Sequence, residues 1–173
     1  AGEAFDKGAR LLGLGFPGGP EIQRVAQGSN APEPLPRAWL GGSLNFSFSG
    51  LKTALLHRTQ ALGLIEPTIN PELDPEEQNH RRSALASGLQ EAIIEVLVEK
   101  TLKAAFQCGA KGVLLGGGVA ANSLLRKEMS RRSSLPVLVP RPALCTDNGA
   151  MVAAAGYFTT QELGFPTEHS LNE

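Results

Sequence analysis

The sequence predicts a helix-rich α/β fold, and three observations support this prediction. Two short apolar runs, residues 112–115 and residues 137–139, have the length and composition of buried strands. Each run is followed by a turn and a helical pattern, over residues 123–132 and 148–163, which makes two strand–turn–helix units in tandem. Residues 75–108 carry a continuous apolar stripe with helical spacing, which predicts one long amphipathic helix.

The N-terminal part is expected to form two short helices around a rigid turn. Residues 3–12 have helical spacing and are followed by a glycine that can end the helix. Residues 16–20 (FPGGP) combine two prolines with two glycines, a composition typical of a rigid turn. A short helix over residues 21–27 follows, with a proline in its first turn.

The middle of the chain is expected to hold one strand and one helix between loops. Residues 43–48 alternate between apolar and polar side chains, which predicts a short strand. Ser49 is then expected to cap a helix over residues 50–62. Residues 27–37 and 65–74 are rich in Pro, Gly, Ser and Asn and are expected to be loops.

Composition limits the classes of function. The 173 residues suffice for one domain or a large part of one, with 42% hydrophobic residues and a net charge of −1. No global field attracts nucleic acid, so RNA contacts would come from local patches such as residues 81–82, 126–127 and 131–132. A plain solvated helix surface is the competing interpretation of these basic pairs.

The cysteines and the termini indicate the compartment. Cys108 and Cys145 show no CxxC spacing, which favours a reduced, cytoplasmic location over a disulfide framework. No apolar run approaches the roughly 18 residues of a membrane span. The chain starts without Met or a signal pattern and inside an apparent helix, so we expect a fragment of a longer protein.

The glycine-rich turn after the first strand suits a phosphate or nucleotide. Residues 116–118 let a ligand approach the backbone, and the following helix offers unpaired N–H groups and a partial positive charge. Asn122 could direct its amide at a base or sugar hydroxyl. The alternative is that the glycines only ease strand–helix packing. A dinucleotide fingerprint is disfavoured because residues 140–142 supply no acid for the ribose, and no Walker lysine follows the glycines.

Asp147 lies where the last helix is expected to begin. It is either an ordinary helix cap or a ligand for a metal ion. The neighbouring Cys145 is expected to be a small packed side chain rather than a nucleophile. His57, His80 and His169 are scattered and form no HxxxH or HExxH pair.

Five segments, in this order, resemble the C-terminal half of one bacterial family, the TsaD proteins. This family comprises the tRNA threonylcarbamoyladenosine transferases, formerly called O-sialoglycoprotein endopeptidases. The segments are residues 1–7 (AGEAFDK), 16–20 (FPGGP), 46–53 (FSFSGLKT), 116–122 (GGGVAAN) and 145–151 (CTDNGAM).

The resemblance implies a partial actin-like/Hsp70-type lobe of the RNase H-like kind. Residues 1–173 would be a C-terminal lobe fragment, with a helical and loop insertion over residues 21–108 and a nucleotide-binding core over residues 109–163. The implied reaction transfers a threonylcarbamoyl group from its adenylate to the adenosine next to the tRNA anticodon. The implied partners are tRNA, proteins of the same pathway and the missing N-terminal lobe, with no membrane.

The resemblance also implies the ligands and their residues. ATP or threonylcarbamoyl-adenylate would be held by Asp6 through ribose hydroxyls, by the backbone at Gly19, by Asn122, and by the glycine turn at Gly117 and Gly118. One divalent metal ion, iron or zinc, would be held by Asp147 and two histidines. The resemblance implies no role for Lys52 or Ser49, and Ser49 is expected only to cap its helix.

The family's paired histidines lie in the N-terminal half, which this chain lacks, so the fragment is expected to be inactive and to bind nucleotide weakly at most. Its two strands would leave an unpaired edge. Two alternatives remain open: a metal-dependent glycoprotein endopeptidase, and a nucleotide-binding or assembly module that uses the long helix to dock a partner.

Overall fold

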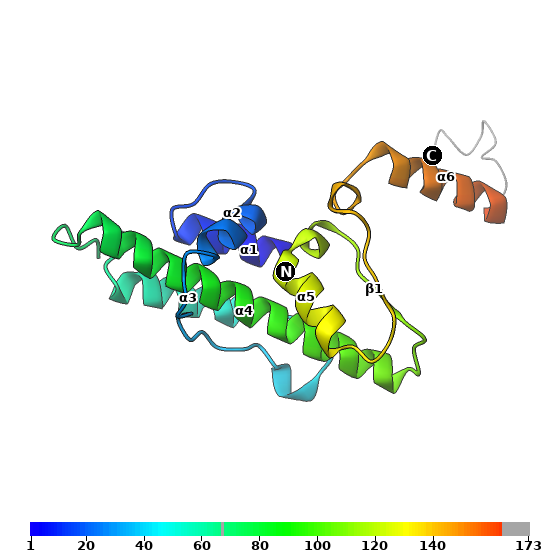
Figure 1. Cartoon of the computed structure of the whole chain (residues 1–173), viewed down its shortest axis with the longest axis horizontal. Helices are drawn as coiled ribbons and strands as arrows, with labels where there is room; N and C mark the ends of the chain where they lie inside the picture. The colour runs from blue at the N-terminus through cyan, green and yellow to red at the C-terminus, as the bar shows by residue number, and fades with distance from the viewer. Residues whose placement is uncertain (67, 164–173) are drawn as a thin grey trace.

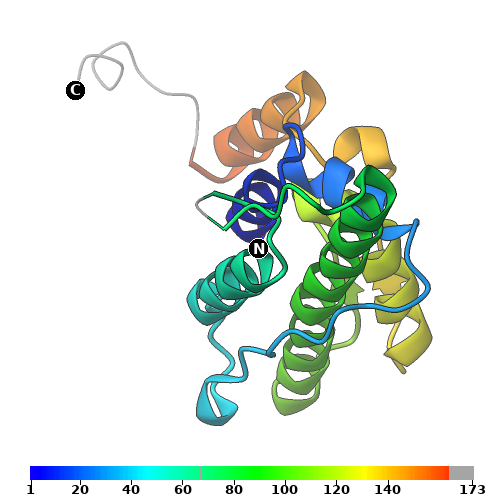
Figure 2. The same ribbon diagram turned by 90° about the vertical axis from the view of Figure 1, so that its left-hand side faces the viewer.

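One long helix organises the computed structural model, which describes residues 1–66 and 68–163. Helix α4 (Pro75–Gln107) runs through the molecule (Figure 1). Helices α1 (Gly2–Leu11), α2 (Gly18–Ala26) and α3 (Ser49–Ala61) pack around its first half. Helix α5 (Ser123–Arg132) packs on the second half, and Figure 2 shows α3 and α5 on opposite sides of α4.

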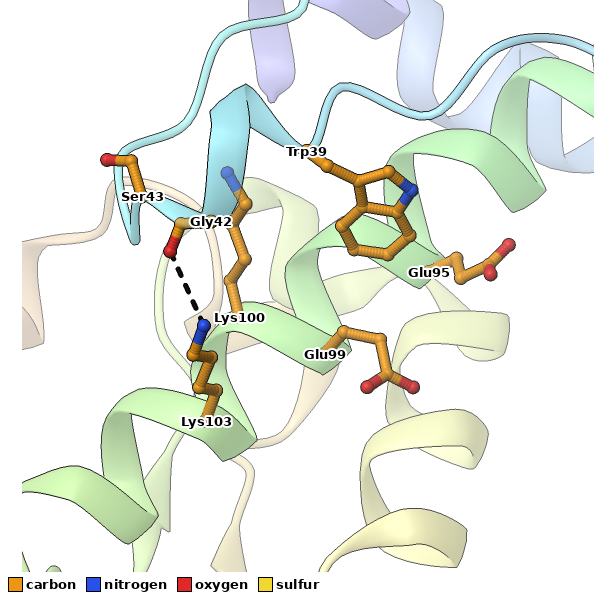
Figure 3. A pocket seen from close by; sticks show the side chains of 7 residues that line it. All are labelled: Trp39, Gly42, Ser43, Glu95, Glu99, Lys100 and Lys103. Atoms are coloured by element: carbon orange, nitrogen blue, oxygen red, sulfur yellow. Dashed lines mark hydrogen bonds between the residues drawn. The ribbon is translucent and has the colours of Figure 1, made fainter.

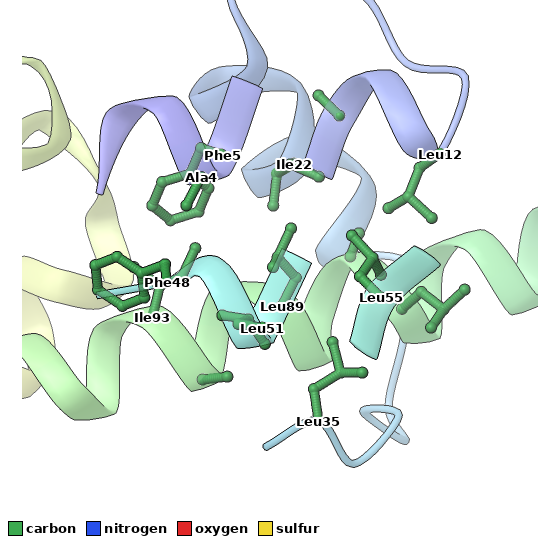
Figure 4. Close-up of a cluster of buried hydrophobic side chains, with 14 of the residues drawn as sticks. Ala4, Phe5, Leu12, Ile22, Leu35, Phe48, Leu51, Leu55, Leu89 and Ile93 are labelled. Atoms are coloured by element: carbon green, nitrogen blue, oxygen red, sulfur yellow. The ribbon is translucent and has the colours of Figure 1, made fainter. Parts of the chain in front are cut away.

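The sequence of α4 explains its length and its central position. Pro75 occupies the first turn, where a missing N–H costs nothing, and Glu76 and Glu77 complement the positive end of the helix. The predicted apolar stripe is confirmed as core, since Leu89 and Ile93 are fully buried against α1 and α3 (Figure 4). The stripe is therefore occupied by the chain's own helices, which disfavours its use as a docking face.

The two predicted strands pair with each other. Strands β1 (Val113–Leu114) and β2 (Val137–Leu138) form a parallel sheet with Val113 opposite Val137. Helix α5 connects them and covers one face, where Val113 packs into a second apolar cluster. Leu114 and Leu138 point the other way and are 76% and 66% exposed. The expected two strand–turn–helix units are present, with one sheet face uncovered.

The predicted strand over residues 43–48 is wrong. This segment is irregular and follows a short 3₁₀ turn, η1 (Leu40–Gly42). Phe48 is buried while Phe46 is exposed, although the alternation placed both on the same side. An extended segment needs a neighbouring strand for its backbone hydrogen bonds, and β1 and β2 pair with each other elsewhere.

The predicted cap at Ser49 is also wrong. Ser49 is the first residue of α3 and its side chain makes no capping bond. Its carbonyl instead accepts a hydrogen bond from the Thr53 hydroxyl, at 3.3 Å.

Helix α6 (Gly149–Leu163) stands apart from the helices around α4 (Figure 1). Its large apolar side chains are exposed: Met151, Val152, Tyr157 and Phe158. In residues 1–66 and 68–163 no helix is both long enough and apolar enough to cross a membrane.

Candidate functional site

The first two helices meet at Asp6 and Gly18. The Asp6 carboxylate accepts a hydrogen bond from the Gly18 backbone N–H at 2.8 Å, which satisfies one of the free donors at the start of α2. A Cβ on Gly18 would lie 2.5 Å from the Asp6 Cα, so this position requires glycine. A Cβ on Gly19 would meet no atom within 4 Å. Gly18 therefore serves packing, whereas the position of a Cβ on Gly19 is unoccupied.

The glycine turn after β1 is equally open. Gly117 has φ +82°, a conformation that favours glycine, and it leads into the 3₁₀ turn η2 (Gly118–Ala121). No atom lies within 4 Å of a Cβ built on Gly116, Gly117 or Gly118. The three glycines do not ease close strand–helix packing here, and the space over them is free for a ligand.

Asn122 has an internal role. Its Oδ1 accepts from the Leu125 backbone N–H at 3.0 Å, so the side chain caps α5. Its Nδ2 donates to the Gln90 Oε1 at 2.8 Å, in the buried interior. The amide that we expected at the mouth of the turn is thus directed inward, and its ligand role stays a prediction.

Gln23 joins the first two helices to the glycine turn. Its Oε1 accepts from both the backbone N–H and the hydroxyl of Ser123, at 2.7 and 3.0 Å. Gly19 and Gln23 are four residues apart on α2 and so share one helix face. The N-terminus of α5 therefore lies against α2, about one helical turn from Gly19.

Arg126 holds the turn that carries Cys145 against η2. Its guanidinium donates to the Ala120 carbonyl at 2.6 Å, to the Pro140 carbonyl at 3.0 Å and to the Cys145 sulfur at 3.1 Å. Cys145 is buried, as expected of a packed side chain. The interpretation of Arg126 as solvated surface is wrong. The four-residue spacing from Asn122, which puts both on one face of α5, is the sequence signal for its position.

Lys52 has a structural role, because it pairs with Glu3 of α1. Its ammonium lies 3.4 Å from the Glu3 carboxylate, which also pairs with Lys7 at 2.6 Å. The hydrogen bond from Lys7 and then that from Lys52 lower the pKa of Glu3. Lys52 thus ties residues 46–53 to α1 on the protein surface.

Asp147 is exposed just beyond the Cys145 turn and does not cap α6. The cap is Asn148, whose Oδ1 accepts from the Met151 N–H at 3.0 Å. Across residues 1–66 and 68–163, no group of three or more His, Cys, Asp or Glu side chains comes together. His57 and His80 lie in this part, and His169 lies outside the described residues. A single carboxylate does not make an iron or zinc site, which needs about four ligands.

Comparisons with known proteins point to one family. A family model described as TsaD, tRNA N6-adenosine threonylcarbamoyltransferase, matches residues 1–154. Proteins with that same name are similar to this chain. One from Dehalococcoides mccartyi is 49% identical over 91% of this chain and 44% of its own length. One from Thermomicrobium roseum is 53% identical, over 93% and 47%, and one from Bacillus subtilis is 48% identical, over 90% and 43%. The chain spans less than half the length of these relatives.

Proposed function

The chain belongs to the TsaD family of tRNA N6-adenosine threonylcarbamoyltransferases, and on that premise we propose that it is the C-terminal part of such an enzyme. The enzyme would transfer a threonylcarbamoyl group from its adenylate to the adenosine next to the tRNA anticodon. One observation carries this proposal beyond the relatives' name. Gln23 of α2 bonds to the start of α5, and Arg126 of α5 bonds to η2 and to the Cys145 turn, so Gly19, the glycine turn and the Cys145 turn, all far apart in sequence, lie on directly connected elements.

The glycines on these elements suit the adenylate half of the donor. A Cβ built on Gly19, Gly117 or Gly118 would meet no atom within 4 Å, so a phosphate or ribose could approach these backbones without a side chain in the way. One oxygen of the Asp6 carboxylate is bonded to Gly18, and the other would accept from ribose hydroxyls. Asn122 would act indirectly, by fixing the turn that carries Gly117 and Gly118.

Positioning is the catalytic contribution we propose for these residues. The adenosine amine attacks the carbamoyl carbon, a C–N bond forms, the C–O bond to the phosphate breaks, and AMP leaves, while the amine loses one proton to the leaving phosphate or to water. Holding the AMP portion on fixed backbone donors aligns the carbamoyl carbon with the amine and stabilises the leaving phosphate.

The iron or zinc ion that the resemblance implies would need ligands beyond those of this chain. Among residues 1–66 and 68–163, Asp147 alone does not make a metal site. Its exposed carboxylate is proposed as one ligand, with the others in the rest of the longer protein. The remaining parts of the proposal are tRNA and pathway proteins as partners, an actin-like lobe completed by an N-terminal lobe, and a cytoplasmic location.

The test uses the full-length protein that contains this chain. Given tRNA, ATP, threonine, bicarbonate and the partner enzymes, it should form threonylcarbamoyladenosine, and Asp147→Ala should abolish the product. Asn148→Ala is the matched control, since it removes the α6 cap next door and leaves the carboxylate in place. Absence of modified tRNA with the unaltered protein would refute the proposal. Peptide cleavage that Asp147→Ala abolishes would favour the endopeptidase instead.

The 173-residue chain has its own expected result. It should show no transferase activity and should bind zinc only weakly in titration calorimetry. Tight zinc binding by this chain would mean that the ligand set is complete without the rest of the protein.

A further inference from the structure

A pocket lies away from the glycine turn, between the loop around η1 and the second half of α4. Its volume is about 340 Å³, in the lower part of the range for small-ligand sites. Figure 3 shows the Trp39 indole at one side and two lysines of α4 reaching up beside the loop. The lining residues are Trp39, Gly42, Ser43, Glu95, Glu99, Lys100 and Lys103.

The loop that carries Trp39 is held in a costly backbone conformation. Leu40, Gly41 and Gly42 have successive φ values of +54°, +59° and +87°. For a leucine this region costs on the order of 1 kcal/mol. Lysines of α4 fasten the loop, since Lys100 donates to the Asn45 carbonyl at 2.6 Å and Lys103 to the Gly42 carbonyl at 3.4 Å. Strain of this kind persists where the surrounding structure enforces it, and it clusters at binding sites.

The two carboxylates that line the pocket are paired with arginines rather than with its two lysines. Glu95 pairs with Arg37 and Glu99 with Arg132, each at 2.7 Å, so both carboxylates already have a cationic partner. Both lysines instead bond to neutral carbonyls, and among the described residues neither pairs with a carboxylate. Lys100 is buried with its ammonium over the Phe46 ring, so the pocket offers the Lys103 ammonium beside an indole that is 42% exposed.

We propose that this pocket binds an unpaired nucleotide of the tRNA substrate, with the base stacked on Trp39 and a phosphate at Lys103. The inference rests on the proposed function, which supplies RNA as the partner. Aromatic side chains next to cations are how proteins hold single-stranded nucleic acid, because every base has a face that can stack. The 3.4 Å bond of Lys103 is long, so its ammonium can turn to a phosphate at little cost.

Trp39 is itself the probe, since the chain contains a single tryptophan. A stacked base quenches indole fluorescence, so titration with an RNA hairpin that has a seven-nucleotide loop should quench it in a saturable way. A fully paired RNA duplex of the same length should quench it far less. Equal quenching by both RNAs, or none by the hairpin, would overturn the proposal without any substitution.

Substitutions identify the contacts, with binding followed by the anisotropy of labelled hairpin. Trp39→Ala should weaken binding roughly 5- to 150-fold, from the 1–3 kcal/mol of one stacked base, while Trp39→Phe keeps part of it. Lys103→Gln should weaken binding and lower the salt slope by about one charge. Lys111→Gln, an equal charge change on an exposed lysine outside the pocket, is the control. Identical effects of the two lysine changes would show general attraction and refute the site.

The outcome is separable from the proposed function. Full-length enzyme that modifies tRNA with Trp39→Ala and Lys103→Gln at unaltered KM for tRNA would reject this pocket while the transferase stands. Hairpin binding that needs Trp39, in a full-length protein with no transferase activity, would reject the transferase and retain the pocket. Quenching by acidic peptides but not by RNA would assign the pocket to a protein partner and overturn the proposal.

Discussion

Replacing Gly18 by alanine should destabilise the protein, whereas the same change at Gly19 should not. A Cβ at position 18 would lie 2.5 Å from the Asp6 Cα and 2.8 Å from the Phe5 carbonyl oxygen. Both atoms belong to the backbone of α1, so the helices must separate by about 1 Å, a strain that costs about 2 kcal/mol. That separation also stretches the 2.8 Å bond between the Asp6 carboxylate and the Gly18 N–H.

Thermal unfolding followed by circular dichroism measures this difference. For a chain of this size about 2 kcal/mol corresponds to a fall in Tm of roughly 4–8 °C. Gly19→Ala should stay within about 0.5 kcal/mol of the unaltered protein, because its Cβ meets no atom within 4 Å. Both positions lie in the first turn of α2, so helix propensity cancels in the comparison. Equal Tm values for the two variants would refute the argument that α1 and α2 are in backbone contact at Gly18.

Three further outcomes are expected. Hydrogen bonds from Arg131 first and Arg132 second lower the pKa of Glu128 from 4.5 to about 2. This ion pair therefore stabilises the fold above pH 4.5, and the contribution is lost as the pH falls toward 2. In Glu128→Gln the free energy of unfolding should fall less steeply between pH 4.5 and 2. The difference from the unaltered protein should stay below about 1 kcal/mol, since the pair is partly exposed. Arg126→Ala should cost about 1–3 kcal/mol by leaving two carbonyls without their donor, and should speed amide exchange around the Cys145 turn, unlike Lys127→Ala. Lysines in place of Leu114 and Leu138 should reduce self-association in light scattering with little change in Tm, because both side chains face solvent on the uncovered sheet face.

The sequence predicted the regular elements well because their signals are local. The stripe of α4, its proline start and the two apolar runs of β1 and β2 need only near neighbours to be recognised. The strand over residues 43–48 failed because strand formation depends on a partner far away in the chain. The segment does alternate between apolar and polar residues, but it packs beside α4 instead of pairing with a strand, and Lys100 donates to its Asn45 carbonyl.

For the candidate site, the sequence identified the turns but not the side chains that join them. Gly117 and Gly118 are recognisable because glycine has few other uses after a strand. Gln23 and Gln90 carry no such signal, since glutamine is common on helix surfaces and its partner is set by tertiary packing. The position of Arg126 cannot be predicted from nearby residues, because two of its three hydrogen bonds, to Pro140 and Cys145, go to a later turn of the chain.

These internal bonds decide which atoms remain for a ligand. The Gln23 carbonyl oxygen already satisfies the first N–H of α5, and the Asn122 oxygen satisfies the N–H at Leu125. The helix N-terminus that the sequence pointed to is therefore largely occupied by the protein's own acceptors. Backbone without a neighbouring side chain at the Cβ position lies one step earlier, at Gly116 and Gly117 before η2, and at Gly19 on α2. If the adenylate binds there as proposed, backbones on two separate elements would orient its phosphate, which a single helix end does not achieve. Gln23, Asn122 and Arg126 would then serve the proposed site by fixing η2, α5 and the Cys145 turn relative to α2.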